Sequence, residues 1–203
     1  YQNYHLRAEF KWGENKFEPR LNFLRDNGIL YHCTGEYGAF WNVWMRAPEM
    51  QVQETDMGDF YALAGVAMDI RSRKSGRADA RGLWAQIYDP SVAIQTIGNV
   101  PGAEGRCRRI LDLERSHGEW NSLELICFED TAVHVVNGQV VMVLRNSRVV
   151  NQSGETLQSL QRGKIQFQSE GAEAYYRRIQ IMPIESIPDR FKAKVKADAD
   201  PSR

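Results

Sequence analysis

Apolar and polar residues alternate with a period of two along most of this chain, which is the spacing of a β-strand and not of a helix. The segment from His5 to Trp12 shows the pattern cleanly. Helical patterning is confined to residues 108–115 and to the segment after Asp189. Many short strands with few helices predict an antiparallel all-β sandwich or barrel. Further alternating runs predict strands over residues 28–33, 40–45, 49–54, 60–70, 83–88, 120–128, 131–136, 139–144, 164–169 and 175–182.

Length and charge indicate one globular domain. A chain of 203 residues is long enough for a sizeable core. Its 26 basic and 26 acidic residues cancel, so its charge favours neither nucleic acid nor an anionic membrane surface as a partner. No apolar run approaches the roughly 18–20 residues that a membrane span needs. We expect a β-sandwich domain over residues 1–188 and a polar C-terminal tail over residues 189–203, frayed from Lys192 onward.

The strongest local signal is Asn137-Gly138 between two valine-rich runs. Both residue types tolerate a positive φ, so the pair predicts a type I′ β-hairpin. The cysteines give weaker information, because an odd count with no metal-ligand spacing argues against a zinc site and leaves a Cys33–Cys107 bridge open. The third cysteine, Cys127, lies in an apolar run and is expected in the core.

The most informative segment covers residues 48–56. In a strand, Met50 and Val52 share one face, and the polar residues Glu49, Gln51 and Gln53 share the other. If the apolar face packs on the core, the opposite face presents a row of carboxyl and amide groups. Such a row suits sugar hydroxyls where it lines the groove of a curved sandwich. On an outward surface it would be an ordinary solvated strand.

The spacing of Glu49 and Glu54 resembles the Glu-x-Asp-x-x-Glu signature of laminarinase-type glucanases, with Gln51 in place of the central Asp. In retaining enzymes of that kind the two carboxyl groups lie about 5–5.5 Å apart. A β-bulge between the two glutamates would bring them to one face. Nearby, Asp56 and Asp59 bracket Met57-Gly58, which makes only a weak case for a calcium ion, and we expect no other cofactor and no other metal.

Aromatic residues cluster immediately before the acidic strand: Tyr37, Phe40, Trp41 and Trp44. Sugar rings present flat C–H faces that dock on such side chains, so the cluster fits a binding platform, and a sandwich core is the alternative. Before it, His32 stands at the end of a predicted strand, where a catalytic and a structural role are both open. The chain has no phosphate-binding loop, dinucleotide fingerprint or Gly-x-Ser-x-Gly motif.

Read in order, several segments resemble the 3-keto-disaccharide hydrolase domain family, and the resemblance covers about residues 4–184. The family's Gly-Glu-Trp-Asn segment is unchanged here at residues 118–121. This chain departs from the family pattern at three positions: it has His32 where the family usually has Arg, Glu54 where it has Asp, and Arg178 where it has Asn. The remaining similar segments are the opening strand 4–10, residues 26–32, the strand 49–54, Gly58–Tyr61, the hairpin around Asn137-Gly138, and the closing segments 163–171 and 176–179.

The resemblance implies a fold and a setting. The fold is a concanavalin-like jelly-roll β-sandwich of two curved antiparallel sheets. The family usually has one or two strands before its opening motif, so we expect this domain to lack an N-terminal edge strand. Members are typically exported, which implies a periplasmic, extracellular or cell-surface location.

The resemblance also implies an enzyme that cleaves glycosides whose sugar has been oxidised to a 3-ketone. The ketone acidifies the proton on C2, so that a base can remove it, the C1 oxygen leaves by β-elimination, and water adds later. We hypothesise Glu49 or His32 as the base and Glu54 or Asp56 as the acid. Gln51 and Gln168 would contact hydroxyls or the enolate, and Arg177, expected to point toward the core side, would stabilise the enolate. The expected substrate-binding residues are Gln51, Gln53, Tyr37, Trp41, Trp44, Gln168, Glu170 and Arg177.

Two other classes of function stay open. One is a conventional retaining β-glucanase that uses Glu49 and Glu54 on unoxidised glycans. The other is a non-catalytic carbohydrate-binding module, which binds glycans without turnover. All three readings expect a carbohydrate partner.

Overall fold

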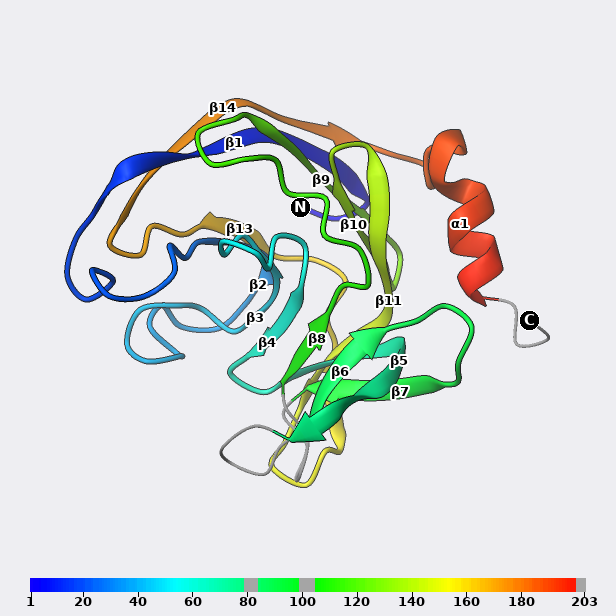
Figure 1. Ribbon diagram of the computed structural model, residues 1–203. Helices are drawn as coiled ribbons and strands as arrows, with labels where there is room; N and C mark the ends of the chain where they lie inside the picture. Colours follow the sequence, from blue (N-terminus) through cyan, green and yellow to red (C-terminus); the bar gives the residue numbers. More distant parts are fainter. Residues whose placement is uncertain (79–83, 99–104, 200–203) are drawn as a thin grey trace.

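The structure is a computed structural model that describes residues 1–78, 84–98 and 105–199. Those residues form fourteen strands and one helix (Figure 1). The elements are β1 (Tyr4–Lys16), β2 (Gly28–Cys33), β3 (Ala47–Gln51), β4 (Phe60–Leu63), β5 (Val66–Ala78), β6 (Trp84–Tyr88), β7 (Ile94–Gly98), β8 (Arg106–Arg108), β9 (Asn121–Phe128), β10 (Thr131–Val136), β11 (Gln139–Val150), β12 (Thr156–Ser159), β13 (Lys164–Phe167), β14 (Ala172–Pro183) and α1 (Asp189–Ala199).

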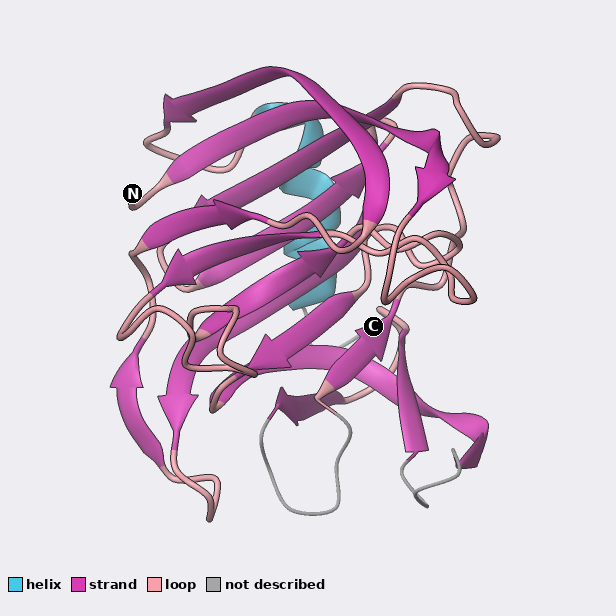
Figure 2. Cartoon of the chain, turned by 90° about the vertical axis from the view of Figure 1, so that its left-hand side faces the viewer, coloured by secondary structure: helices cyan, strands magenta, loops and turns pink. Residues whose placement is uncertain are grey.

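The strands form one curled sheet in the order β13-β2-β3-β4-β8-β6-β5-β11-β10-β9-β1-β14, with β12 beside β11 and β7 beside β5. The layer that contains β13, β2, β3 and β4 faces the layer that contains β1, β9, β10 and β14 (Figure 1). Figure 2 shows the described chain as mostly strand, with the helix behind the strands. The predicted all-β jelly-roll sandwich is confirmed. It differs from two separate antiparallel sheets, because β5 and β11 join the layers and the β6–β8 pair is parallel.

The main core fills the space between the layers. Leu6 and Phe10 of β1 and Ile29 of β2 are buried there, together with Met50 and Val52. Fully burying a side chain of this size stabilises the fold by about 1.5–3 kcal/mol. The sequence alternation placed these residues correctly, and where the register is unbroken it also indicates which side of a strand faces away from the core.

The Asn137-Gly138 hairpin is confirmed. The two residues connect β10 to β11 with φ angles of 49° and 80°, the positive values that a type I′ turn requires. The predicted strand over residues 60–70 is instead two strands, β4 and β5. Between them, Ala64 and Gly65 turn the chain with φ angles of 54° and 83°.

Two other local expectations were wrong. Residues 40–45 form turns and an isolated bridge between Phe40 and Trp44, and not a strand. The helical pattern after Asp189 is confirmed as helix α1, but residues 192–199 continue this helix and are not frayed, because Phe191 is buried against the apolar outer side of β9, β10 and β11. The sequence left a Cys33–Cys107 bridge open, and the structure shows none, since all three cysteines are free and buried, with Cys127 in the core as expected. Across the described ranges, no helix is long and apolar enough to cross a bilayer.

Candidate functional site

One side of the β13–β2–β3 layer is polar. Residues that pair directly across antiparallel strands point to the same side of a sheet. Glu49 pairs with Leu30 and Gln51 pairs with Gly28, whereas the intervening Met50 enters the core. The predicted separation of the two faces of this strand is therefore confirmed. The side opposite the core has a set of carboxyl and amide groups that we call the polar face: Asp26, Glu49, Gln51, Gln53, Gln168 and Glu170.

Glu49 is the most buried acid of the polar face, with 4% of the residue exposed. Its carboxyl group lies over Gly28, where a Cβ atom would be 1.7 Å from Glu49 Oε1 and 2.9 Å from Gln168 Oε1. Burial raises the pKa of Glu49 well above its usual value, the charges of Asp26 and Glu170 raise it further, and a hydrogen bond with Gln168 lowers it. The direction of this shift favours the protonated form of the carboxyl group, which can act as an acid.

Asp26 is also buried on the polar face, close enough that its charge raises the pKa of Glu49. It forms an isolated antiparallel bridge with Glu170. Its Oδ2 atom is 2.8 Å from Arg20 Nη2 and accepts a hydrogen bond of 2.7 Å from Gln53 Nε2. Burial, followed by repulsion from Glu170, raises the pKa of Asp26 to about 6, although Arg20 and Gln53 lower it. A carboxyl group that titrates near neutral pH is suited to act as a general base.

Two acceptor atoms of the polar face are buried without a hydrogen-bond partner, Asp26 Oδ1 and Gln168 Oε1. Tyr176 of β14 has a similarly unpartnered hydroxyl group, and burial, followed by the charge of Glu49, raises its pKa. An unmet buried polar atom costs about 1–3 kcal/mol. Unmet acceptors beside a protonated carboxyl group would be satisfied by a ligand with several hydroxyl donors.

His32 does not belong to the polar face. It is buried on the core side of β2, where its ring centroid is 5.7 Å from that of Tyr4 and 5.6 Å from that of Tyr31. Its Nδ1 atom is 3.1 Å from the carbonyl oxygen of Leu160. Burial lowers the pKa of His32 to about 4, which makes it a weak base. The hypothesis that His32 is the catalytic base is therefore replaced by a structural role.

Glu54 holds the segment that precedes β2. Its carboxyl group accepts hydrogen bonds from Arg25 Nη1 at 2.8 Å and from the Arg25 backbone at 2.9 Å. His117 lies beyond it, with Nδ1 3.5 Å from Glu54 Oε1. Both carboxylate oxygens thus have partners, and Glu54 is poorly placed to donate a proton to a leaving group.

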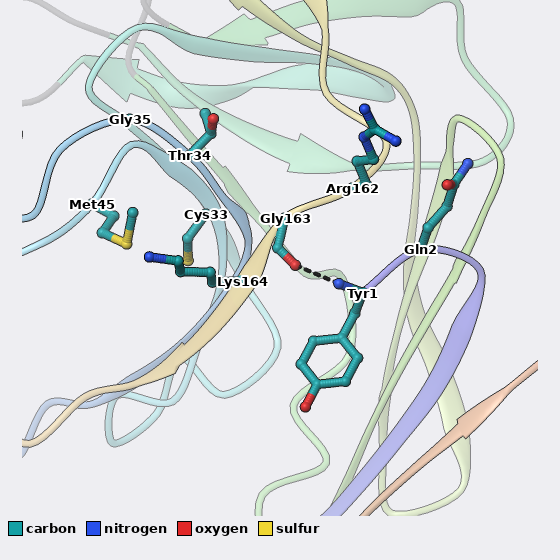
Figure 3. Close-up of a pocket in the computed structure, with 9 residues that line it drawn as sticks. All are labelled: Tyr1, Gln2, Cys33, Thr34, Gly35, Met45, Arg162, Gly163 and Lys164. Carbon is teal, nitrogen blue, oxygen red and sulfur yellow. Dashed lines mark hydrogen bonds between the residues drawn. The ribbon is translucent and has the colours of Figure 1, made fainter.

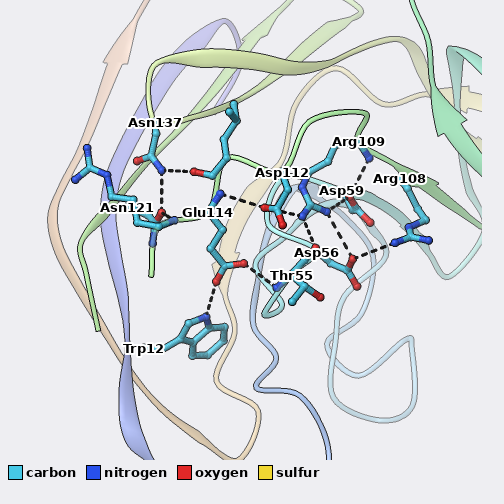
Figure 4. Close-up of polar contacts among 12 residues, drawn as sticks. Trp12, Thr55, Asp56, Asp59, Arg108, Arg109, Asp112, Glu114, Asn121 and Asn137 are labelled. Carbon is cyan, nitrogen blue, oxygen red and sulfur yellow. Dashed lines mark hydrogen bonds and ion pairs between the residues drawn. The ribbon is translucent and has the colours of Figure 1, made fainter. Parts of the chain in front are cut away.

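Asp56 belongs to a cluster of ion pairs beside the polar face (Figure 4). Arg106 Nη2 is 2.7 Å from both Asp56 and Asp59, and Arg109 Nη1 is 2.9 Å from Asp59. The weak calcium expectation rested on these same two aspartates, which here pair with arginines. Within the part of the chain that the structure describes, no group of three or more His, Cys, Asp or Glu residues is arranged to hold a metal ion. The arrangement gives Asp56 a structural role.

Arg177 points away from the core, which corrects the expectation for this residue. It pairs with Glu9, with Nε 2.6 Å from Glu9 Oε2, and its guanidinium carbon is 3.8 Å from the ring centroid of Trp120. This contact is on the outer side of the β1–β14 layer, since the neighbouring pair Phe10 and Tyr176 packs toward the core. Arg177 therefore cannot stabilise an enolate at the polar face.

The aromatic residues of the 34–46 segment form an exposed platform. Tyr37 and Trp41 are 74% and 73% exposed, and Phe40 stacks on Trp41 with ring centroids 4.8 Å apart. Trp44 packs under them against a cluster that includes Leu30, the pairing partner of Glu49. The platform is therefore on the same side of the layer as the polar face.

A hollow of about 590 Å³ lies beside this platform, at the end of β2 and the start of β13 (Figure 3). Lys164 on its rim donates a hydrogen bond of 2.8 Å to the hydroxyl group of Tyr37. None of the described residues in the lining belongs to the polar face: Tyr1, Gln2, Cys33, Thr34, Gly35, Met45, Arg162, Gly163 and Lys164.

The Gly-Glu-Trp-Asn segment at residues 118–121 has a structural function (Figure 4). Asn121 Oδ1 accepts hydrogen bonds from the Arg115 backbone at 2.9 Å and from Asn137 Nδ2 at 2.8 Å. Asn137 in turn donates to the carbonyl oxygen of Leu113 at 2.7 Å. The segment thereby ties the Asn137-Gly138 hairpin to the chain that enters β9.

Sequence reasoning missed two residues of the site, Asp26 and Arg20. A signal existed for Asp26, because it has the same strand parity as Gly28 and lies two residues before the start of β2. Arg20 lies in the segment between β1 and β2, which has no periodic pattern, and only the folded chain brings it to Asp26 and Glu170.

The fold and the polar face define an all-β sandwich domain with a buried group of carboxyl and amide side chains. Among solved structures, a candidate glycosyl hydrolase from Parabacteroides distasonis ATCC 8503 is similar at 16% identity and a TM-score of 0.52, covering 91% of this chain and 73% of that one. The carbohydrate-binding module CBM66 from Bacillus subtilis is similar at 6% identity and a TM-score of 0.47, over 89% and 75% of the two chains.

No curated protein sequence matches this one. The model of the 3-keto-alpha-glucoside-1,2-lyase-like domain family matches residues 1–182. The chain belongs to this family.

Proposed function

We propose that this domain cleaves glycosides whose sugar has been oxidised to a ketone at C3, and that the reaction takes place on the polar face. One observation supports the proposal above all: two buried carboxyl groups of the polar face interact electrostatically and have different protonation ranges, Asp26 with a pKa of about 6 and Glu49 with a pKa raised well above its usual value. Such a division matches a base and an acid that work at the same pH. The family of the chain points to the same chemistry.

The proposed reaction starts with Asp26. Its carboxylate takes the proton from C2 of the sugar, and the electron pair of that C–H bond moves toward the C3 carbonyl to form an enolate. The enolate then re-forms the ketone while the C1–O bond breaks, and Glu49 gives its proton to the departing oxygen. The product is an unsaturated 3-keto sugar, to which water later adds across the double bond.

Two amide groups would bind the substrate. Gln51 and Gln168 are buried on the same face, and the unpartnered Oε1 of Gln168 would accept a hydrogen bond from a sugar hydroxyl. The exposed rings of Trp41 and Tyr37 would support the leaving group. Because Glu49 is 4% exposed, binding requires the segments over the polar face to move apart.

The test compares a glucoside with its 3-keto form and measures release of the aglycone. We expect turnover of the keto form alone, with loss of turnover in Glu49→Gln and Asp26→Asn. The matched controls Glu155→Gln and Asp130→Asn change exposed carboxylates and should behave as wild type. Full activity of either polar-face variant would refute its assigned role.

The same assay tests the second candidate function, a carbohydrate-binding module. The exposed platform of Trp41 and Tyr37 favours this function, and it predicts glycan binding without turnover of either substrate. Turnover of the unoxidised glucoside would instead indicate a conventional glycosidase. That outcome has less support, because Arg25 occupies both oxygens of Glu54.

A further inference from the structure

Two carboxylates of the polar face lie against each other at its edge. Asp26 and Glu170 face each other in an isolated antiparallel bridge, and their side chains are 9% and 16% exposed. In a site with little water, two adjacent negative charges repel strongly, and one of them takes up a proton unless a cation intervenes.

Arg20 is the cation that contacts both groups. Its Nη2 atom is 2.8 Å from Asp26 Oδ2 and also pairs with Glu170. The other groups that face Asp26 are the amide of Gln53, which donates a hydrogen bond of 2.7 Å, and the carboxyl groups of Glu49 and Asp56. Of these described neighbours, Arg20 alone is positively charged.

The position of Arg20 is set by Gly171. The Phe17 backbone donates to the Gly171 carbonyl oxygen at 2.7 Å, and the Arg20 backbone donates to the Phe17 carbonyl oxygen at 2.7 Å. Gly171 has a φ of 61°, and a Cβ atom there would be 3.0 Å from the Phe17 carbonyl oxygen and 3.4 Å from Arg20 Cγ. The closing Glu170-Gly171 pair thus supplies both a partner for Arg20 and the room for its segment.

We propose that Arg20 is a positioning residue of this site: it holds Asp26 and Glu170 side by side as carboxylates and thereby sets the pH range in which Asp26 accepts a proton. The effect of Arg20 on turnover rests on the proposed function. Its effect on the proton affinity of Asp26 does not, and it can be measured in the free protein.

The decisive experiment titrates the Asp26 carboxyl carbon by NMR in protein with ¹³C-labelled aspartate, assigned by comparison with Asp26→Asn. An opposite charge at this distance lowers the pKa of an aspartate by about 1–3 units. Arg20→Gln should therefore raise the proton affinity of Asp26 at least about tenfold. Arg20→Lys, which keeps the charge, should restore most of the wild-type titration.

Arg25→Gln is the matched control, because Arg25 lies in the same segment and pairs with a different carboxylate, Glu54. It should leave the Asp26 titration unchanged. If Arg20→Gln does not fold, Arg20→Met provides the second test, since it keeps most of the aliphatic part of the side chain and removes only the charge, and it should raise the proton affinity of Asp26 in the same way. An Asp26 titration that is the same in wild type and in the variant tested refutes the proposal.

The turnover measurement separates this inference from the proposed function. If Asp26 is the base, the acidic side of the pH profile of kcat/KM should shift to higher pH in Arg20→Gln, by the same number of pH units as the Asp26 titration measured by NMR. A shifted titration with no turnover in any variant would uphold the role of Arg20 and refute the proposed function. An unshifted Asp26 titration in variants that still turn over the 3-keto-glucoside would refute the role of Arg20 and uphold the proposed function.

Discussion

Gly28→Ala tests the geometry of the polar face with one methyl group. The new Cβ atom would lie 1.7 Å from Glu49 Oε1, and ordinary contact begins at 3.4 Å, so the carboxyl group must move by about 1.7 Å. The clash is with the end of a flexible side chain, so the strand can stay in place while the acid shifts. Misplacement of a reacting group by about 1 Å can cost about 100-fold in rate. We therefore expect kcat/KM for a 3-keto-glucoside to fall at least about 100-fold, with little change in thermal stability.

The control for this prediction is Gly76→Ala, because a Cβ atom at Gly76 meets nothing within 4 Å. That variant should keep wild-type activity. A double variant sharpens the result: once Glu49→Gln has removed the acid, adding Gly28→Ala should cost little more, since both changes act on the same proton donor. A folded Gly28→Ala protein with wild-type kcat/KM would refute the placement of the reaction at Glu49.

Three further predictions concern stability, binding and thiol reactivity. The folded state raises the pKa of Glu49 above its unfolded value, so the stability that its proton provides is complete below about pH 4.5. That stability is lost as pH rises, by up to about 1.4 kcal/mol per pH unit. In denaturant unfolding between pH 5 and 8, the free energy of unfolding of Glu49→Gln should therefore rise relative to that of wild type, and a constant difference between the two proteins would contradict this sign. Trp41→Ala should change the free energy of unfolding by less than about 0.5 kcal/mol. It should raise KM about two- to tenfold, because stacking of the ring on the sugar, worth about 0.5–1.5 kcal/mol, is lost. An unchanged KM would exclude a contact between Trp41 and the sugar. Alkylation followed by mass measurement should find Cys33, Cys107 and Cys127 protected in the native protein and all three reactive after unfolding, since burial raises the pKa of each thiol; rapid native labelling would contradict their burial.

The fold could be predicted wherever the local sequence determines the local structure. Asn137-Gly138 requires only two positive φ angles, and its neighbours need no distant partner to form a hairpin. The alternation through Met50 and Val52 reports which side of β3 is apolar, so the opposite placement of Glu49 follows. The strand patterns alone could not distinguish a sandwich from a barrel. The prediction of a jelly-roll came from the resemblance of the whole chain to its family.

The site was harder to predict because its groups come from segments without periodicity. Arg20 meets Asp26 and Glu170 only after residues 17–27 fold over the layer. The 34–46 segment is rich in aromatic residues, so its pattern resembles that of a strand, yet Trp44 packs on a cluster with residues from three strands, β2, β3 and β4. Parity along one strand gives no information about either contact.

The two roles that the structure overturns most clearly have one physical cause, a β-bulge. In β2, Leu30 pairs with Gln166 and Cys33 with Lys164, so two residues, Tyr31 and His32, stand opposite one. His32 has a φ of 50°, and the extra residue returns its ring to the core side. A bulge reverses parity for every residue beyond it, and alternation in the sequence does not reveal its position.

A second β-bulge lies in β14. Arg177 pairs with Glu9 and Gln180 with Arg7, so two residues face one, and Arg178 has a φ of 51°. Parity counted back from Ile181 therefore places Arg177 on the wrong side. Gly28, Glu49 and Gln51 lie in a stretch of β2 and β3 whose register is unbroken, which is why the same counting succeeded there. Both bulges occur where a polar side chain was expected to approach the sugar, so the sequence pattern identifies the polar face reliably only over strands that keep their register.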